Sequence, residues 1–165
     1  MVHENVGVYI TWPAGKKDFP NFKKNVSRHL DTILRGTFLA VDPASNSLGW
    51  AVFENGKYKS SGTLKAPAKL PLPGRLQYMH DNFKDLKGHK LLVVEAIRSV
   101  KLSQVVRYAV GMTLVASRAE EYIECPIPVW KAVAAASSTY TKTDEQDAIM
   151  IGASAVFVAM EIEND

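Results

Sequence analysis

Two short apolar runs, separated by a few small and polar residues, mark the part of the chain where strands are easiest to predict. The first run extends from Gly36 to Val41 and the second from Leu48 to Phe53. Between them, Pro43–Asn46 has the composition of a tight turn, and Glu54-Asn55-Gly56 is a second turn signal. The alternating segment from Lys57 to Leu64 predicts a third strand. We therefore expect a three-stranded antiparallel meander.

Two later segments predict the rest of the sheet. Lys90 to Glu95 is wholly apolar between its terminal charges, which is typical of a strand buried in a parallel arrangement. Ile127 to Trp130 predicts a fifth strand. Lys65 to Gly74 contains three prolines and is expected to be a loop. Residues 1–20 have no regular pattern.

Helical spacing of apolar residues predicts four helices: Asn21–Leu34, Arg75–Leu86, Val100–Glu124 and Asp144–Ile162. The first is amphipathic and basic, and packing on the sheet, contact with a partner subunit and contact with nucleic acid all fit it, with packing favoured. The third is the longest, and its small and apolar residues predict a dimer surface. The last begins with acidic residues, as the helix dipole favours.

The composition is that of an ordinary globular protein of one domain. Of the 165 residues, 47% are hydrophobic and 22% are charged, which excludes a disordered or fibrous chain. The single cysteine, Cys125, excludes an internal disulfide and a multi-cysteine zinc site, and it favours a reducing compartment. No apolar run approaches the ~18 residues that span a bilayer. Residues 1–9 lack the layout of a signal peptide. We expect a cytoplasmic protein without membrane contact.

Charge is unevenly distributed along the chain. Lys57 to Arg107 contains eleven basic and three acidic residues, whereas Tyr108 to the end contains three basic and nine acidic residues. A basic region beside an acidic one suits an enzyme that binds a polyanion and uses carboxylates in its chemistry. For any single lysine, ordinary solvation is the simpler interpretation.

Four acids occupy positions where they can meet. Asp42 and Glu95 each end an apolar strand, and Asp144 and Asp147 lie three residues apart in the first turn of a helix. Converging carboxylates repel one another unless cations neutralise them, and oxygen ligands suit Mg²⁺ or Mn²⁺. Two such ions about 4 Å apart support in-line displacement at a phosphodiester. Taken separately, Asp42 also fits a proline turn, and the helical pair also fits ordinary capping.

The segments around these acids resemble the motifs of RuvC-type Holliday-junction resolvases, which are members of the RNase H-like superfamily. The resemblance covers Gly36–Ile162 and is carried by four groups of residues: 41–45 with 48–52, 72–76, 94–96 and 142–148. Residues 1–35 lie outside it, which divides the chain into an N-terminal extension with an amphipathic helix and a nuclease domain over 36–165. A chain shortened in this way resembles the compact resolvases of phages.

The resemblance implies an α/β, RNase H-like fold with a mixed five-stranded sheet flanked by helices. It also implies a homodimer in the cytoplasm of a bacterial or phage-infected cell that cuts branched DNA, such as a four-way junction, leaving a 5′-phosphate and a 3′-hydroxyl. The cofactor would be Mg²⁺, with Mn²⁺ as a substitute and two ions per active site. The catalytic and metal-binding residues would be Asp42, Glu95, Asp144 and Asp147.

Two features depart from the family pattern. The family often has an aromatic wedge a few positions after the second acid, where this chain has Arg98, which would stack on a base or contact a phosphate. The segment before the last helix is also short and retains only Lys131 and Lys142 of its lysines. Five residues are the candidates for DNA binding: Arg98, Lys101, Arg107, Lys131 and Lys142.

Other functions remain open at this stage. Actin-like ATPases and sugar kinases have a related first motif but need two such domains, which 165 residues cannot hold. A nuclease of the same fold with broader specificity, for example for flaps or RNA hybrids, is the main enzymatic alternative. A junction-binding protein without catalytic activity would leave the four acids without a role.

Overall fold

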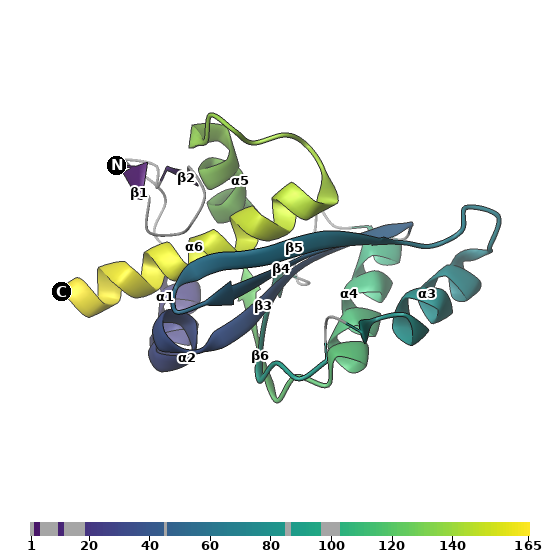
Figure 1. The fold of residues 1–165 in the computed structure, drawn as a ribbon, viewed down its shortest axis with the longest axis horizontal. Helices are drawn as coiled ribbons and strands as arrows, with labels where there is room; N and C mark the ends of the chain where they lie inside the picture. The colour runs from purple at the N-terminus through teal and green to yellow at the C-terminus, as the bar shows by residue number, and fades with distance from the viewer. Residues whose placement is uncertain (1, 4–9, 12–18, 45, 85–86, 97–102) are drawn as a thin grey trace.

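The computed structural model describes residues 2–3, 10–11, 19–44, 46–84, 87–96 and 103–165. At its centre is a mixed sheet of five strands in the order β5-β4-β3-β6-β7 (Figure 1). The strands are β3 (Thr37–Pro43), β4 (Ser47–Glu54), β5 (Lys57–Lys65), β6 (Leu91–Glu95) and β7 (Glu121–Cys125). The first three pair antiparallel, whereas β6 is parallel to β3 and β7 is parallel to β6. The predicted meander and the predicted mixed sheet are confirmed.

Helices cover both faces of the sheet. They are α1 (Pro20–Ser27), α2 (Leu30–Arg35), α3 (Leu72–Asp81), α4 (Gln104–Ser117), α5 (Ile127–Ala136) and α6 (Asp144–Asn164). Helix α6 lies along one face with α5 outside it, and α4 lies on the other face with α3 beside it (Figure 1). A separate antiparallel pair, β1 (Val2–His3) and β2 (Ile10–Thr11), lies within the segment expected to be irregular. In the described stretches, no helix combines the length and apolar character needed to cross a membrane.

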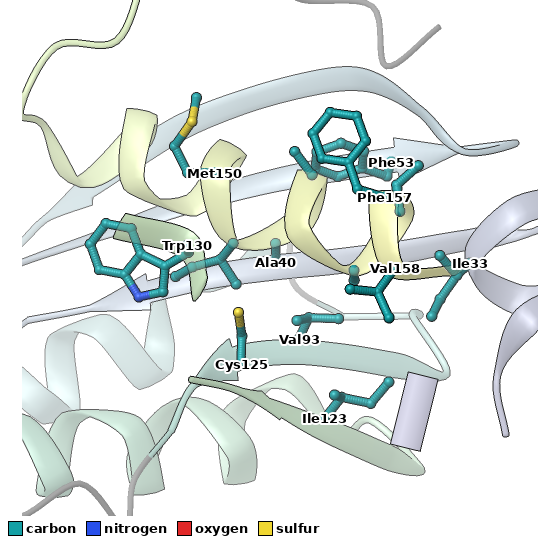
Figure 2. Packing of buried hydrophobic residues seen from close by; sticks show 14 of the residues in the cluster. Ile33, Ala40, Phe53, Val93, Ile123, Cys125, Trp130, Met150, Phe157 and Val158 are labelled. Carbon is teal, nitrogen blue, oxygen red and sulfur yellow. The ribbon is translucent and has the colours of Figure 1, made fainter. Parts of the chain in front are cut away.

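The larger core layer lies between the sheet and α6 (Figure 2). Every residue from Ala148 to Ala159 is buried, because α6 has the sheet on one side and α1, α2 and α5 on the other. Phe38 and Phe53 are register partners, and their rings stack 5.1 Å apart. A methyl group at Gly152 would lie 2.1 Å from the Phe53 ring, so this glycine allows α6 to pack closely on the sheet.

The fifth strand is not where the sequence placed it. The prediction of one helix over Val100–Glu124 is wrong at its end, because α4 stops at Ser117 and Arg118 adopts left-handed backbone geometry (φ 53°). The chain then enters β7, which pairs with β6. The strand predicted over Ile127–Trp130 is instead the start of α5. Pro128 lies in the first turn of that helix, where the missing N–H has no intrahelical partner to lose.

Two other helices differ from their predictions in extent. The segment Asn21–Leu34 forms two helices, because His29 leaves helical geometry (φ −127°). Both helices still bury apolar side chains against α6, as the packing interpretation expected. Helix α3 begins at Leu72 inside the predicted loop and ends at Asp81, where the Asn82 side chain donates to the Tyr78 carbonyl at 2.8 Å. The domain boundary after residue 35 stays a prediction.

Candidate metal centre

Side-chain alternation places two carboxylates on the same face of the sheet. In β3, Phe38 and Ala40 belong to the core layer beneath α6, so Asp42 faces α6 as well. In β6, Val93 belongs to that layer, and Glu95 follows it by two residues. Because β3 and β6 are adjacent and parallel, both acids lie where their strands end, at one edge of the sheet. We call it the carboxylate edge.

The first turn of α6 brings the other two acids to this edge. Thr143 caps the helix, and its hydroxyl accepts a hydrogen bond from the Gln146 N–H at 3.1 Å. Gly49 is the register partner of Asp42 on the adjacent strand. A methyl group at Gly49 would lie 1.9 Å from the carbonyl oxygen of Asp144, so only glycine lets the helix approach β4 this closely. The start of α6 therefore lies beside Asp42.

Three of the four predicted acids form a compact cluster. Carboxylate oxygens of Asp42, Asp144 and Asp147 lie within 4.8 Å of one another. Burial raises the pKa of Asp42 to about 9, and the charges of Glu95, Asp147 and Asp144 add to this effect. Burial also raises the pKa of Asp147, although hydrogen bonds from Tyr140 and Asp42 oppose the rise. The cluster therefore joins one buried carboxyl group, Asp42, to two half-buried ones, Asp144 and Asp147.

The fourth acid, Glu95, borders the cluster and has an exposed fraction of only 7%. Burial raises its pKa, and the nearby positive charge of Lys131 opposes that rise. The indole N–H of Trp130 is buried without a hydrogen-bond partner among the described residues, yet it lies close enough to stabilise ionised Glu95. The Lys131 ammonium is 5.9 Å from the centroid of the Trp130 ring. Lys131 of α5 is thus a cationic neighbour of both Glu95 and Asp147.

Two hydroxyl groups hold the acids, and sequence reasoning missed both. The Ser47 hydroxyl donates to Oδ2 of Asp144, and the Tyr140 hydroxyl donates to Oδ1 of Asp147. Burial and the Asp147 charge raise the pKa of Tyr140, so its hydroxyl stays a neutral donor. The one available signal was spacing: Ser47 precedes Gly49 by two residues and so shares its strand face.

The donor set fits a hard divalent cation. All four acids offer only oxygen, which suits Mg²⁺ or Mn²⁺ and not a thiolate-preferring metal. Clustered carboxylates with raised pKa values gain stability from a bound cation, because it removes their mutual repulsion.

The predicted DNA-binding residues have different positions. Lys131 is exposed on α5 and its charge acts on Glu95 and Asp147. Lys142 is exposed just before α6, and Arg107 is exposed in the first turn of α4, on the other side of the sheet. Arg98 and Lys101, including the position of the expected wedge, lie outside the described residues.

Strand order and helix placement define the class of fold. An antiparallel meander followed by two parallel strands, with helices on both faces, is the RNase H-like α/β arrangement that the sequence predicted. No protein-family model and no curated protein matches this chain.

Solved structures identify the fold more closely. A structure of RuvC from Thermus thermophilus matches with a TM-score of 0.53 and 18% identity, over 76% of this chain and 96% of that one. The same protein in complex with a Holliday junction substrate matches with a TM-score of 0.53 and 16% identity, over 75% and 95%. This chain therefore has a RuvC-like fold, and about a quarter of it lies outside the match.

Proposed function

We propose that this chain is a divalent-metal-dependent endonuclease that resolves four-way or otherwise branched DNA. The observation that carries the proposal is the meeting of Asp42, Asp144 and Asp147, with Glu95 beside them, at one edge of the sheet. The fold supports it, because RuvC shares the fold and has been captured with a Holliday junction substrate. A purely structural role would not require four carboxyl groups, two of them buried, to gather at one edge against their repulsion.

In this proposal, the four acids hold Mg²⁺ or Mn²⁺, two ions per site. The ions, when bound, activate water and stabilise the leaving oxygen of the phosphodiester. Ser47 and Tyr140 fix the orientation of two of the acids, because each hydroxyl holds one carboxylate oxygen. Burial of Asp42 and Glu95 keeps bulk water from competing for their oxygens.

Exposed basic residues near the site would contact the phosphates. Lys131 lies on α5 and Lys142 just before α6, and both are exposed. Their positive charges would attract a phosphate of the DNA toward the acids. Arg98 and Lys101, which precede α4 in the chain, and Arg107 in its first turn remain proposed contacts.

A homodimer would present two sites for paired cuts on opposite strands. Helix α4 offers a surface for it, because Val105, Tyr108 and Val115 are exposed by 36%, 51% and 69% at spacings that place them along one side of the helix.

The test is cleavage of a synthetic four-way junction beside a linear duplex, a flap and an RNA–DNA hybrid. Wild type and Asp42→Asn are compared in Mg²⁺, in Mn²⁺ and in EDTA. We expect symmetric cuts in the junction that need the metal and fall at least 100-fold in the variant. Lys57→Ala, which removes a charge at the far end of β5, is the matched control and should cut normally.

Each other outcome changes the proposal in a defined way. Equal cutting of the flap would broaden the activity to a branch-selective nuclease. Cutting confined to the RNA–DNA hybrid would change the proposed substrate from branched DNA to an RNA–DNA hybrid. Tight junction binding with no cutting in either metal would contradict the enzyme and leave a junction-binding protein.

A further inference from the structure

A groove of about 500 Å³ lies between α1 and the edge strand β7. Its helical wall is one face of α1, formed by Asn21, Lys24, Asn25 and Arg28, at spacings of three and four residues. The helix also packs in the core through Val26 and through Phe22, which borders the groove as well. The groove face of α1 therefore consists of side chains that donate hydrogen bonds, two of them cationic.

These cations are available to an anionic ligand. The segment from Phe19 to Leu30 contains no acidic residue. Among the described residues, the ion pairs are formed by other basic residues, and Lys24 and Arg28 take part in none of them. Both side chains are exposed. Phosphates along this wall would be attracted without displacing a protein carboxylate.

The strand wall has a different chemistry. Tyr122 lines the groove from β7 and is 47% exposed, which is unusual for so large an aromatic side chain. Glu121 and Glu124 line the same wall, with Glu124 on the strand face of Tyr122 and Glu121 on the other face. Glu121 is paired with His29 of the helical wall at 2.8 Å, so one acid already has a partner. An exposed aromatic ring beside a carboxylate suits a nucleobase, because the ring stacks and the carboxylate accepts from base N–H groups.

One end of the groove reaches the carboxylate edge. Ala96 and Pro126 line that end, and Ala96 directly follows Glu95 in the chain. The Ala96 N–H donates to the Cys125 carbonyl at 2.9 Å, which ties the ends of β6 and β7 together. The other end lies at Glu121, the partner of Leu91 at the start of β6. The groove thus leads away from the candidate metal centre along the outer strand.

We propose that this groove binds an unpaired segment of the DNA substrate, with its phosphates along α1 and a base stacked on Tyr122. The proposal rests on the function proposed above for the choice of DNA. It gives the N-terminal extension a role in holding a strand that leaves the metal centre. A positive wall with an aromatic platform is the general design of single-strand binding sites, and the groove volume is of the order that holds a nucleotide-sized ligand.

Binding of a fluorescein-labelled oligothymidine of about 15 nucleotides, followed by fluorescence anisotropy in EDTA, tests the groove without any cleavage. Tyr122→Leu should weaken binding about tenfold, whereas Tyr122→Phe, which retains the ring, should stay within about twofold of wild type. Lys24→Ala with Arg28→Ala should weaken binding and lower the slope of log Kd against log salt by about 1.4, as expected for two lost phosphate contacts. Lys57→Ala with Lys59→Ala removes equal charge on β5, the opposite edge strand of the sheet, and should leave the slope unchanged.

Thermal melting of each variant confirms that it is folded, since all the altered side chains are exposed. Wild-type affinity and slope in both groove variants would contradict DNA binding in the groove, even if the chain cuts junctions. Equal weakening by Tyr122→Leu and Tyr122→Phe would overturn the stacking role. If the groove variants lose binding while wild type cuts no branched substrate, DNA binding in the groove is supported and the proposed nuclease activity is contradicted.

Discussion

The carboxyl group of Asp42 is nearly buried among three other carboxyl groups, so its ionisation is unfavourable without a bound cation. Its pKa is raised from 3.8 to about 9, which means that the folded protein binds a proton here far more tightly than the unfolded chain does. The stability that this proton confers is fully present below about pH 4 and is lost as pH rises toward 9. Each pH unit in that window lowers the free energy of unfolding by on the order of 1 kcal/mol.

Asp42→Asn should therefore stabilise the metal-free protein at alkaline pH. The asparagine cannot ionise, and its amide can still donate to Asp147, as protonated Asp42 does. We expect the Tm of the variant to exceed that of wild type by roughly 8–16 °C near pH 8 in EDTA and to equal it near pH 4. Differential scanning fluorimetry across this pH range measures the effect.

The matched measurement is addition of Mg²⁺ or Mn²⁺ at pH 8. The metal should raise the Tm of wild type and leave Asp42→Asn nearly unchanged, which would reverse their order. A pH-independent difference between the two proteins would contradict a proton held at Asp42.

The residues of the site differ in how well the sequence revealed them. Asp42 and Glu95 could be predicted because each interrupts an apolar strand, and Asp144 and Asp147 because they open a strongly patterned helix. Ser47 and Tyr140 could not, because their roles depend on tertiary contacts with acids 97 and seven residues away. The spacing of Ser47 from Gly49 gives only its strand face, and Tyr140 has no spacing that separates it from an ordinary turn residue.

At the scale of elements, the close approach of α6 to β4 decides where two of the acids lie. Gly49→Ala would place a methyl group 1.9 Å from the Asp144 carbonyl, so the start of α6 must move away. We expect the free energy of unfolding to fall by about 1–3 kcal/mol. Metal-dependent cleavage should fall by about 100-fold, because a shift of about 1 Å misplaces the ligands.

Gly74→Ala is the control for this prediction, since its new methyl group would meet only ordinary contacts at 3.5 Å. Chemical denaturation and junction cleavage are measured on both variants, and Mn²⁺ affinity by calorimetry shows whether the ligands have moved. Normal Mn²⁺ affinity in Gly49→Ala would show that this contact does not position the acids.

Elements also show why sequence reasoning failed at β7. Local pattern favoured a continued helix through Glu124, since the residues before it keep helical spacing. The left-handed turn at Arg118 and the pairing with β6 override that preference. A five-residue edge strand is stabilised by pairing with its neighbour, here β6, and the local sequence carries no information about that pairing. The sequence likewise did not separate the six-residue α2 from α1, because the apolar face of α1 continues in α2 after the break at His29.

At the scale of the whole molecule, the proposed activity requires two cuts: one site per chain would nick a junction, and resolving it requires a second cut on the opposing strand. A dimer through α4 would supply the second site. Val115 is 69% exposed, so Val115→Glu should leave the fold intact and disfavour burial of this helix against another copy. Asn164→Glu adds the same charge at the exposed end of α6 and is the matched control.

Light scattering should give wild type and Asn164→Glu twice the mass of the 18.2 kDa chain and should give Val115→Glu the mass of one chain. The same proteins are then tested on a supercoiled plasmid that extrudes a cruciform. Paired cuts by a dimer within one binding event yield linear plasmid, whereas a monomer releases nicked circles because the first cut relaxes the substrate. We therefore expect linear product from wild type and nicked circles from Val115→Glu, at similar rates of first cutting. A dimeric Val115→Glu that still produces linear plasmid would move the subunit interface away from α4.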